Sequence, residues 1–298
     1  MTVSRSPPGV IINDCWRPDA NVVRLRESGP DSGCCRIHRW NHTVLTAFTR
    51  DVNTGIGSCE LTFLPRVGID IDLALEQHRQ YKLALASLGC EVINVPTQPG
   101  LVDSVFIEDT AMVLDEIAVL CRPGAASRRP EVDGVEAVLQ EYRALESIRP
   151  PGTLDGGDLL RIGKVIYAGL SKRSNQSGIT QLRGIVADYG YSVKIVETTK
   201  CLHLKSAVSA VAAGTLLINS DWIHRSAFQD YELIDVDKAE AHASNALLVG
   251  RNVIYPTSFP RTMEKLLARG ISVLAVDVSE LQKAEGGVTC CSLIFATP

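Results

Sequence analysis

The chain has 298 residues, of which 45% are hydrophobic, and it carries a formal net charge of −4 at neutral pH. This composition predicts a globular protein with a large core, and the charge argues against nucleic acid as its partner, because phosphate binding needs concentrated positive charge. No apolar run reaches the roughly 18 residues of a membrane span, and residues 1–8 lack the apolar segment of a secretory signal. Nine cysteines without framework-like spacing favour reduced thiols and a cytoplasmic location.

Three helices are predicted from the hydrophobic pattern, over residues 72–88, 177–189 and 261–269. Each helix runs into a glycine (Gly89, Gly190 and Gly270), and a β-rich run begins three residues later, at 92–95, 193–196 and 273–276. Glycine at this position favours the left-handed backbone that closes a helix. We therefore expect the same helix–turn–strand unit at three places along the chain.

Short apolar segments between these units predict β-hairpins, because polar or glycine-containing turns join them in pairs. The predicted pairs are 111–114 with 117–121, 159–162 with 165–168, 206–211 with 216–219, and 246–249 with 253–255. An apolar strand that starts at Cys291 is predicted to end the chain. The recurring unit is strand–strand–helix–strand, and its repetition predicts a closed, pseudo-symmetric α/β assembly rather than two independent domains.

Polar residues fall at matching places, in the loops that precede successive hairpins and the final strand. These loops carry Glu108 and Asp109, then Asp155, then His203, then Ser244–Asn245, and finally Cys290. In a pseudo-symmetric ring, equivalent loops converge on the axis. We therefore expect Glu108, Asp109, Asp155, His203 and Cys290 to share one central pocket.

A thiol, a histidine and a carboxylate together indicate nucleophilic catalysis, with the histidine as acid and base. The acidic residues of the expected pocket favour a cationic substrate, and carboxylates pair especially well with a planar guanidinium group. Two arginines in loop-like segments, Arg128 and Arg173, are suited to a substrate carboxylate. A guanidino amino acid satisfies both demands.

Each of these residues, taken singly, also has a structural interpretation. Most free cysteines are small buried residues, which is one interpretation of Cys290, and His203 lies between two leucines as structural histidines often do. Asp155 fits a plain turn, and Arg128 and Arg173 fit the protein surface. Only their combination indicates a site.

Several longer motifs occur together, and through them the chain resembles the dimethylarginine dimethylaminohydrolase family of the guanidine-modifying superfamily. The matching segments are 103–109 (DSVFIED), 122–132 (RPGAASRRPEV), 153–158 (TLDGGD), 169–175 (GLSKRSN), 202–206 (LHLKS) and 289–292 (TCCS). The resemblance implies a five-bladed α/β-propeller, or pentein, of ββαβ modules around a central active site. It implies one catalytic domain over residues 43–298; residues 1–42 have no counterpart, and we expect them to be a poorly ordered extension.

The resemblance also implies roles for individual residues. Cys290 would be the nucleophile, His203 the general acid and base, and Asp155 the carboxylate that orients it. Glu108 and Asp109 would bind the guanidinium group, Asp103 the α-amino group, and Arg128 and Arg173 the α-carboxylate. Methylated arginine would give citrulline and an alkylamine through a covalent thiouronium intermediate, with no metal or organic cofactor.

Two further residues belong to this expected substrate site, and both concern its selectivity. Val52 begins the segment 52–58, which would cover the substrate and which differs from mammalian sequences. Glu285 stands where mammalian relatives carry aspartate, so its contact with the substrate amine is expected to be altered. Loops of this kind control access to a site and its selectivity.

Two other functions remain open from the sequence. An arginine deiminase-like hydrolase would use the same groups on unsubstituted arginine or on another N-substituted arginine. A zinc-binding interaction protein is the non-enzyme alternative, because Cys34, Cys35, His38 and His42 lie close together, although adjacent cysteines rarely form a tetrahedral cage. The partner expected on the first interpretation is a small guanidino amino acid, and a homodimer remains open.

Overall fold

Five three-stranded sheets repeat along the chain in the computed structural model, which describes residues 44–198 and 200–297. In every sheet the first two strands are antiparallel, and the third strand lies parallel to the second. The strands of the first sheet are β15 (Leu293–Thr297), β1 (Val44–Thr49) and β2 (Cys90–Asn94).

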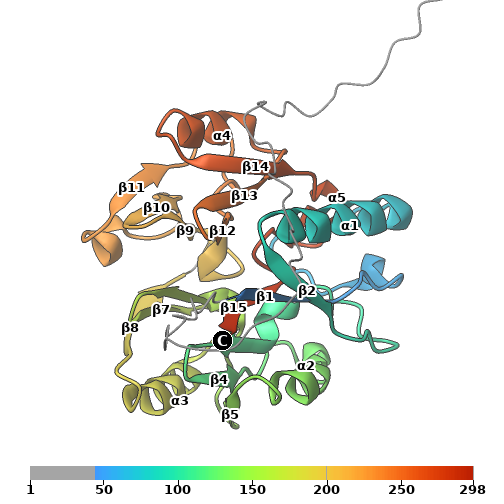
Figure 1. Ribbon diagram of the computed structural model, residues 1–298, viewed down its shortest axis with the longest axis vertical. Helices are drawn as coiled ribbons and strands as arrows, with labels where there is room; N and C mark the ends of the chain where they lie inside the picture. Colours follow the sequence, from blue (N-terminus) through green and yellow to red (C-terminus); the bar gives the residue numbers. More distant parts are fainter. Residues whose placement is uncertain (1–43, 199, 298) are drawn as a thin grey trace, which may run out of the picture. The chain divides into compact units, whose positions relative to one another are not determined.

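The other four sheets follow one another in chain order (Figure 1). The second contains β3 (Ala111–Val113), β4 (Ile117–Leu120) and β5 (Ala144–Ser147), and the third contains β6 (Leu159–Ile162), β7 (Val165–Leu170) and β8 (Ser192–Glu197). The fourth contains β9 (Val208–Ala212), β10 (Thr215–Ile218) and β11 (Glu232–Asp235), and the fifth contains β12 (Leu247–Val249), β13 (Asn252–Pro256) and β14 (Ser272–Val276).

Helical crossovers join the parallel strands of each sheet, because parallel neighbours cannot be joined by a tight turn. These are α1 (Ile71–Ser87), α2 (Glu131–Leu139), α3 (Gln176–Ala187) and α4 (Pro260–Leu267), which lie at the periphery of the strands in Figure 1. In the fourth sheet a single 3₁₀ turn, η6 (Arg225–Phe228), takes this place. A short helix, α5 (Ser279–Gln282), precedes the final loop.

The three helices predicted with a glycine cap are confirmed, each to within two residues at either end. Gly89, Gly190 and Gly270 all have positive φ angles, of 88°, 76° and 73°. At the other end, the Asp70 side chain caps α1 by accepting a hydrogen bond from Leu73 N, and Asn175 caps α3 in the same way from Gly178 N.

Helix α2 and strands β1, β5 and β11 had no counterpart among the predicted elements. Helix α2 ends at Leu139 without a glycine, and the backbone N–H groups of Gln140 and Arg143 donate to the carbonyls of Glu136 and Leu139 at its end. Strands β5 and β11 are four residues long; β5 is exposed at alternate positions, and β11 is exposed at its first and last residues. The last strand begins at Leu293, two residues later than expected, and Cys291 is fully buried ahead of it.

Five hydrophobic clusters lie between the sheets, and each draws on two of them. The first and second sheets share a cluster that contains Phe48 and Leu120, and the second and third share one that contains Val119 and Ile166. The third and fourth meet at Tyr167 and Leu216, the fourth and fifth at Leu217 and Tyr255, and the fifth and first at Ile254 and Ala47. Neighbouring residues of one strand, such as Leu216 and Leu217, thus pack in different clusters.

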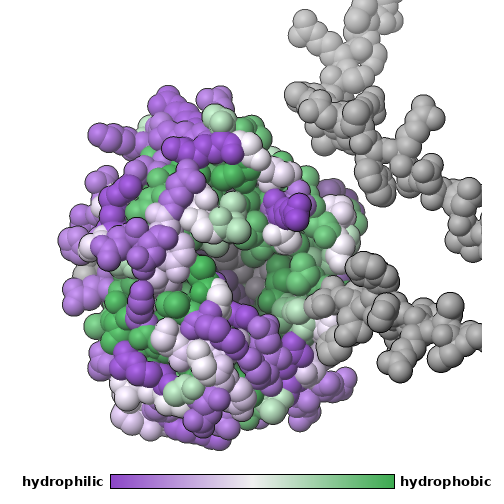
Figure 2. Space-filling model, turned by 60° about the vertical axis from the view of Figure 1, so that its left-hand side comes forward, coloured by the Kyte–Doolittle hydropathy of each residue, from purple (hydrophilic) through white to green (hydrophobic). Residues whose placement is uncertain are grey.

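The two ends of the described chain meet in the first sheet, where β1 and β15 pair from Val44 with Thr297 to Phe48 with Leu293. Within the described residues, no helix combines the length and apolar character that a membrane crossing needs. Figure 2 shows hydrophobic side chains gathered around a hollow near the middle of the face in view.

Candidate active site

The candidate functional side chains lie on four loops, each just before the first strand of a sheet. Three of them are single 3₁₀ turns, η2 (Ile107–Thr110), η4 (Gly156–Asp158) and η5 (Leu204–Ser206), and η4 contacts both of the others. The fourth is the loop at residues 286–290, which is tied to η2 by a hydrogen bond from Glu108 N to the carbonyl of Cys290 (3.1 Å). The predicted convergence of these loops is therefore present in the structure.

His203 lies between two carboxylates. Its Nε2 is 3.0 Å from Asp155 Oδ2, and its Nδ1 is 3.8 Å from Asp109 Oδ1. Asp155 is held in turn by Gly124 N, which donates to its Oδ1 (2.8 Å). Gly157 must be glycine here, because a Cβ at this residue would lie 2.6 Å from His203 Nδ1.

The two carboxylates determine the charge of His203. Burial by itself lowers the pKa of this imidazole, but the charge of Asp109 and the hydrogen bond to Asp155 outweigh it and raise the pKa to about 9. The pKa of Asp109 is lowered, since His203 and Arg128 outweigh the opposing effect of burial. At neutral pH the site therefore holds an imidazolium flanked by carboxylates.

Cys290 is partly exposed, and its Sγ accepts a hydrogen bond from Gly287 N (3.3 Å). Burial, Glu108 and Asp109 together raise the pKa of this thiol to about 12, against smaller opposing effects of Gly287 and Lys205. The resting cysteine is therefore protonated at neutral pH. A cation placed among these carboxylates would favour the thiolate, which is the reactive form.

The carboxylate of Glu108 contacts residues that hold the loop carrying Cys290. Its Oε1 is 2.5 Å from Lys205 Nζ, and its Oε2 accepts a hydrogen bond from Thr289 Oγ1 (2.9 Å). The Asn245 amide holds the same threonine, since it donates to Thr289 Oγ1 and accepts from Thr289 N. Glu108 thus reaches Cys290 through Thr289.

Arg128 is buried and paired with carboxylates. It donates to Asp109 Oδ2 (2.6 Å), to both carboxylate oxygens of Glu131 (3.2 and 2.8 Å) and to the carbonyl of Phe106 (2.9 Å). Arg173 has fewer partners, and its Nη2 donates to Thr62 Oγ1 (3.1 Å). Arg128 therefore fixes the position of Asp109, whereas Arg173 has more donors available for a ligand.

A small cavity of about 20 Å³, called here the acidic cavity, brings most of the predicted residues together. It is lined by Glu60, Asp103, Phe106, Asp109, Arg128, Arg173, Leu202, His203, Ala284, Glu285, Gly286 and Cys290. Three predicted residues do not line it. Asp155 lies behind His203, Glu108 is turned toward Lys205, and Val52 is buried in the hydrophobic cluster between the fifth and first sheets.

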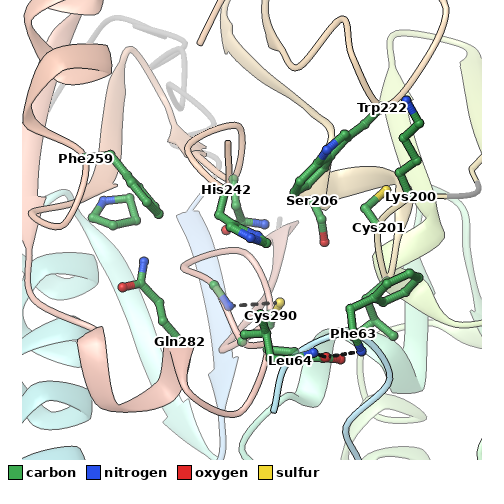
Figure 3. Close-up of a pocket in the computed structure, with 16 residues that line it drawn as sticks. Phe63, Leu64, Lys200, Cys201, Ser206, Trp222, His242, Phe259, Gln282 and Cys290 are labelled. Atoms are coloured by element: carbon green, nitrogen blue, oxygen red, sulfur yellow. Dashed lines mark hydrogen bonds between the residues drawn. The ribbon is translucent and has the colours of Figure 1, made fainter. Parts of the chain in front are cut away.

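A second cavity of about 220 Å³, called here the aromatic vestibule, adjoins the first at Leu202, Glu285, Gly286 and Cys290. Its remaining wall is formed by Phe63, Leu64, Lys200, Cys201, Ser206, Trp222, His242, Asn245, Pro256, Phe259, Gln282 and Gly287. Figure 3 shows Phe259 and Gln282 on one side, Trp222 and Phe63 on the other, and Cys290 between the two groups. The cysteine therefore faces both cavities.

Glu285 fastens a loop to the edge of both cavities. Its Oε1 accepts hydrogen bonds from Thr62 N (3.1 Å), Phe63 N (2.5 Å) and Leu64 N (2.6 Å). The residue has a φ of 59°, a left-handed conformation that is unusual outside glycine. This carboxylate is thus engaged with backbone, and it holds the segment that presents Phe63 and Leu64 to the vestibule.

Asp109, Asp155 and His203 are the described residues whose grouping resembles a metal site, with ligand atoms all within 4.8 Å of one another. Each carboxylate oxygen already has a partner, since Arg128 and Gly157 N donate to Asp109 while Gly124 N and His203 contact Asp155. The arrangement fits a hydrogen-bonded charge network. The proposed zinc ligands Cys34, Cys35, His38 and His42 lie outside the described residues.

Lys205, Thr289, Asn245 and Glu131 also belong to this network, but the sequence analysis assigned them no role. One of them carried a usable signal, because Glu131 follows Arg128 by three residues, a spacing that pairs opposite charges on a helical turn. Lys205 and Asn245 act through partners far away in the sequence, which the sequence pattern does not indicate.

Comparison with known proteins agrees with this geometry. The family described as "N,N dimethylarginine dimethylhydrolase, eukaryotic" matches residues 66–295. The N(G),N(G)-dimethylarginine dimethylaminohydrolase of Streptomyces coelicolor is 39% identical over 234 residues, which cover 78% of this chain and 90% of the relative.

Two solved structures are also similar. The dimethylarginine dimethylaminohydrolase of Pseudomonas aeruginosa, as a cysteine-to-serine mutant complexed with citrulline, superposes with a TM-score of 0.81 at 33% identity, covering 85% of this chain and 100% of that one. The substrate-bound N-terminal domain of a cyanobacterial arginine dihydrolase gives a TM-score of 0.75 at 20% identity, covering 84% and 97%. The second similarity concerns the fold alone.

Proposed function

Because the chain belongs to the dimethylarginine dimethylaminohydrolase family, and is thus a hydrolase of carbon–nitrogen bonds, we propose that it converts N-ω-methylated L-arginine to L-citrulline and methylamine or dimethylamine. One observation carries this proposal. Cys290 and His203 line the same cavity as Asp103, Asp109 and Arg173, so a nucleophile, an acid and groups for both ends of a guanidino amino acid are together.

Substrate binding in the acidic cavity prepares the nucleophile. Asp109 holds the guanidinium, Asp103 the α-amino group, and Arg173 the α-carboxylate, with Arg128 adding positive charge while it holds Asp109. Glu108 acts on the guanidinium end of the substrate indirectly, because it helps to hold the loop that carries Cys290. Val52 packs in the core and supports the segment 52–58, which covers the substrate. The bound cation offsets the carboxylates that keep Cys290 protonated, and the thiol loses its proton to solvent.

Chemistry then proceeds in two steps. The Cys290 thiolate forms a bond to the guanidinium carbon, and the imidazolium of His203 gives its proton to the substituted nitrogen as that carbon–nitrogen bond breaks. The covalent thiouronium is then attacked by water, which loses a proton to the neutral His203, and citrulline leaves as the thiolate is regenerated. Asp155 orients the imidazole throughout.

We also propose that residues 43–298 form a single catalytic domain in which the five sheets close into a propeller around this site. The five hydrophobic clusters support closure, because each joins one sheet to the next and the cluster with Ile254 and Ala47 joins the fifth to the first. The pairing of β15 with β1 supports it in the same way.

Citrulline formation from dimethylarginine, monomethylarginine and arginine tests the function. We expect turnover of the methylated substrates, little turnover of arginine, and loss of activity in Cys290→Ser with the fold retained. A Cys290→Ser enzyme of undiminished activity would overturn the catalytic assignment. Faster turnover of arginine than of either methylated substrate would favour the deiminase alternative instead.

A further inference from the structure

The aromatic vestibule and the acidic cavity differ in chemistry although they share Cys290. The acidic cavity is lined by the ionisable groups Glu60, Asp103, Asp109, Arg128 and Arg173. The vestibule is lined instead by aromatic and aliphatic side chains, among them Phe63, Leu64, Trp222, Pro256 and Phe259. A molecule bound against Cys290 therefore meets a charged chamber on one side and an apolar chamber on the other.

The charged groups of the described vestibule wall are engaged elsewhere. The Glu285 carboxylate accepts three backbone N–H groups, and Lys200 Nζ donates to the carbonyl of Asp221 (2.8 Å). Burial lowers the pKa of His242, against a smaller effect of Glu285, so this imidazole is neutral at pH 7. It stacks edge-on against Trp222, with ring centroids 4.9 Å apart. The vestibule thus suits an apolar group.

The size of the vestibule exceeds what methyl groups require. Its volume is about 220 Å³, compared with about 20 Å³ for the acidic cavity. One water, which is similar in size to a methyl group, needs roughly 10–15 Å³ on this measure. Two methyl groups fill only a small part of this volume, so the vestibule has room for a larger group beside Cys290.

We propose that the enzyme hydrolyses arginines whose guanidine carries a larger apolar substituent, such as a propyl or benzyl group, and that the vestibule binds this substituent. The inference rests on the proposed function. With the amino-acid end held at Asp103 and Arg173 and the guanidinium carbon at Cys290, the substituted nitrogen points to the vestibule. The reaction is unchanged: the carbon–sulfur bond forms, His203 protonates the departing alkylamine, and water releases citrulline.

The test compares citrulline and amine release from N-ω-propyl-L-arginine, N-ω-benzyl-L-arginine and dimethylarginine with the full chain. Gln282 lines the vestibule but not the acidic cavity, so Gln282→Trp fills the space and Gln282→Ala is its matched control. We expect Gln282→Trp to lower kcat/KM for the benzyl substrate about tenfold or more while dimethylarginine changes by less than about twofold. Gln282→Ala enlarges the vestibule instead of filling it, so it should not lower kcat/KM for the benzyl substrate.

The outcomes separate the two proposals. Turnover of dimethylarginine without turnover of either larger substrate overturns this inference and leaves the proposed function intact. An equal loss of activity on all substrates in Gln282→Trp overturns the placement of the substituent in the vestibule. Failure of every substrate, with a folded protein by circular dichroism, overturns the proposed function and this inference with it.

Discussion

Lys205 Nζ lies 2.5 Å from Glu108 Oε1, beside the loop that carries Cys290. The two side chains are 15% and 10% exposed, so the pair is largely removed from water. Burial raises the pKa of Glu108, and the Lys205 ammonium is the largest effect that opposes it. The loop that carries Cys290 is therefore fastened through Thr289 to a carboxylate whose charge depends on one lysine.

Replacing this lysine should destabilise the protein strongly. Lys205→Met leaves the Glu108 carboxylate buried without its counter-ion, which we expect to lower the free energy of unfolding by about 3 kcal/mol or more. Urea denaturation measures the loss. The double variant Lys205→Met/Glu108→Gln should recover most of it, because Glu108 then no longer carries a buried charge without a counter-ion. A double variant as unstable as the single one would contradict the buried-charge explanation.

His203 should make stability depend on pH on the alkaline side. Its folded pKa of about 9 exceeds the unfolded value near 6.5, so its contribution is complete below pH 6.5 and is lost as the pH rises through about 9. The free energy of unfolding, measured from pH 6 to 10 in wild type and His203→Gln, gives this contribution as a difference. The difference should shrink as the pH rises, and a difference that grows would refute the raised pKa.

Cys290 should react slowly with iodoacetamide at neutral pH, because its pKa is raised to about 12 by burial and then by Glu108 and Asp109. Removing one of these charges in Asp109→Asn should lower the pKa and increase alkylation at pH 8 severalfold. Asp115→Asn, which removes an exposed aspartate paired with Arg161, is the control. Mass spectrometry of the Cys290 peptide follows the reaction, and equal rates in both variants would exclude the influence of Asp109.

Glu285 should control the loop at residues 62–64. In Glu285→Ala three backbone N–H groups lose their acceptor, so we expect KM to rise about tenfold with a smaller change in kcat. Trypsin should also cleave faster after Arg66, which follows this loop. Glu285→Gln keeps one carbonyl oxygen and should fall between alanine and wild type, and Glu116→Ala, at an exposed ion pair, is the control. An unchanged cleavage rate in Glu285→Ala would show that the loop is held by other contacts.

The sequence predicted those elements whose ends are determined by residues nearby in the chain. Helices α1, α3 and α4 end at glycines with positive φ, and the hairpins turn at short polar segments, so neighbouring residues specify both. Helix α2 escaped detection because no glycine follows its last residue, Leu139. Strands β5 and β11 have few apolar residues and are strands only because β4 and β10 pair with them.

The candidate site also has a part that the sequence predicted and a part that it did not. Asp109, Asp155, His203 and Cys290 were predicted together because repeated loops place them at equivalent positions. The direction of each side chain was not predictable, since it depends on partners distant in the sequence. Glu108 is turned by Lys205, and Glu285 by backbone groups more than two hundred residues away. Val52 lies in the core for the same reason, because it packs in one cluster with residues distant in the sequence such as Ile254.

The pairing of β15 with β1 has a consequence for folding kinetics. A contact between the two ends of a long chain costs much loop-closure entropy and forms late unless other contacts precede it. The loop at residues 286–290 leads into β15, so Cys290, the proposed nucleophile, reaches its place only when this late contact is made. On refolding from denaturant, catalytic activity should therefore return in the slowest phase, after the helices and local hairpins have formed.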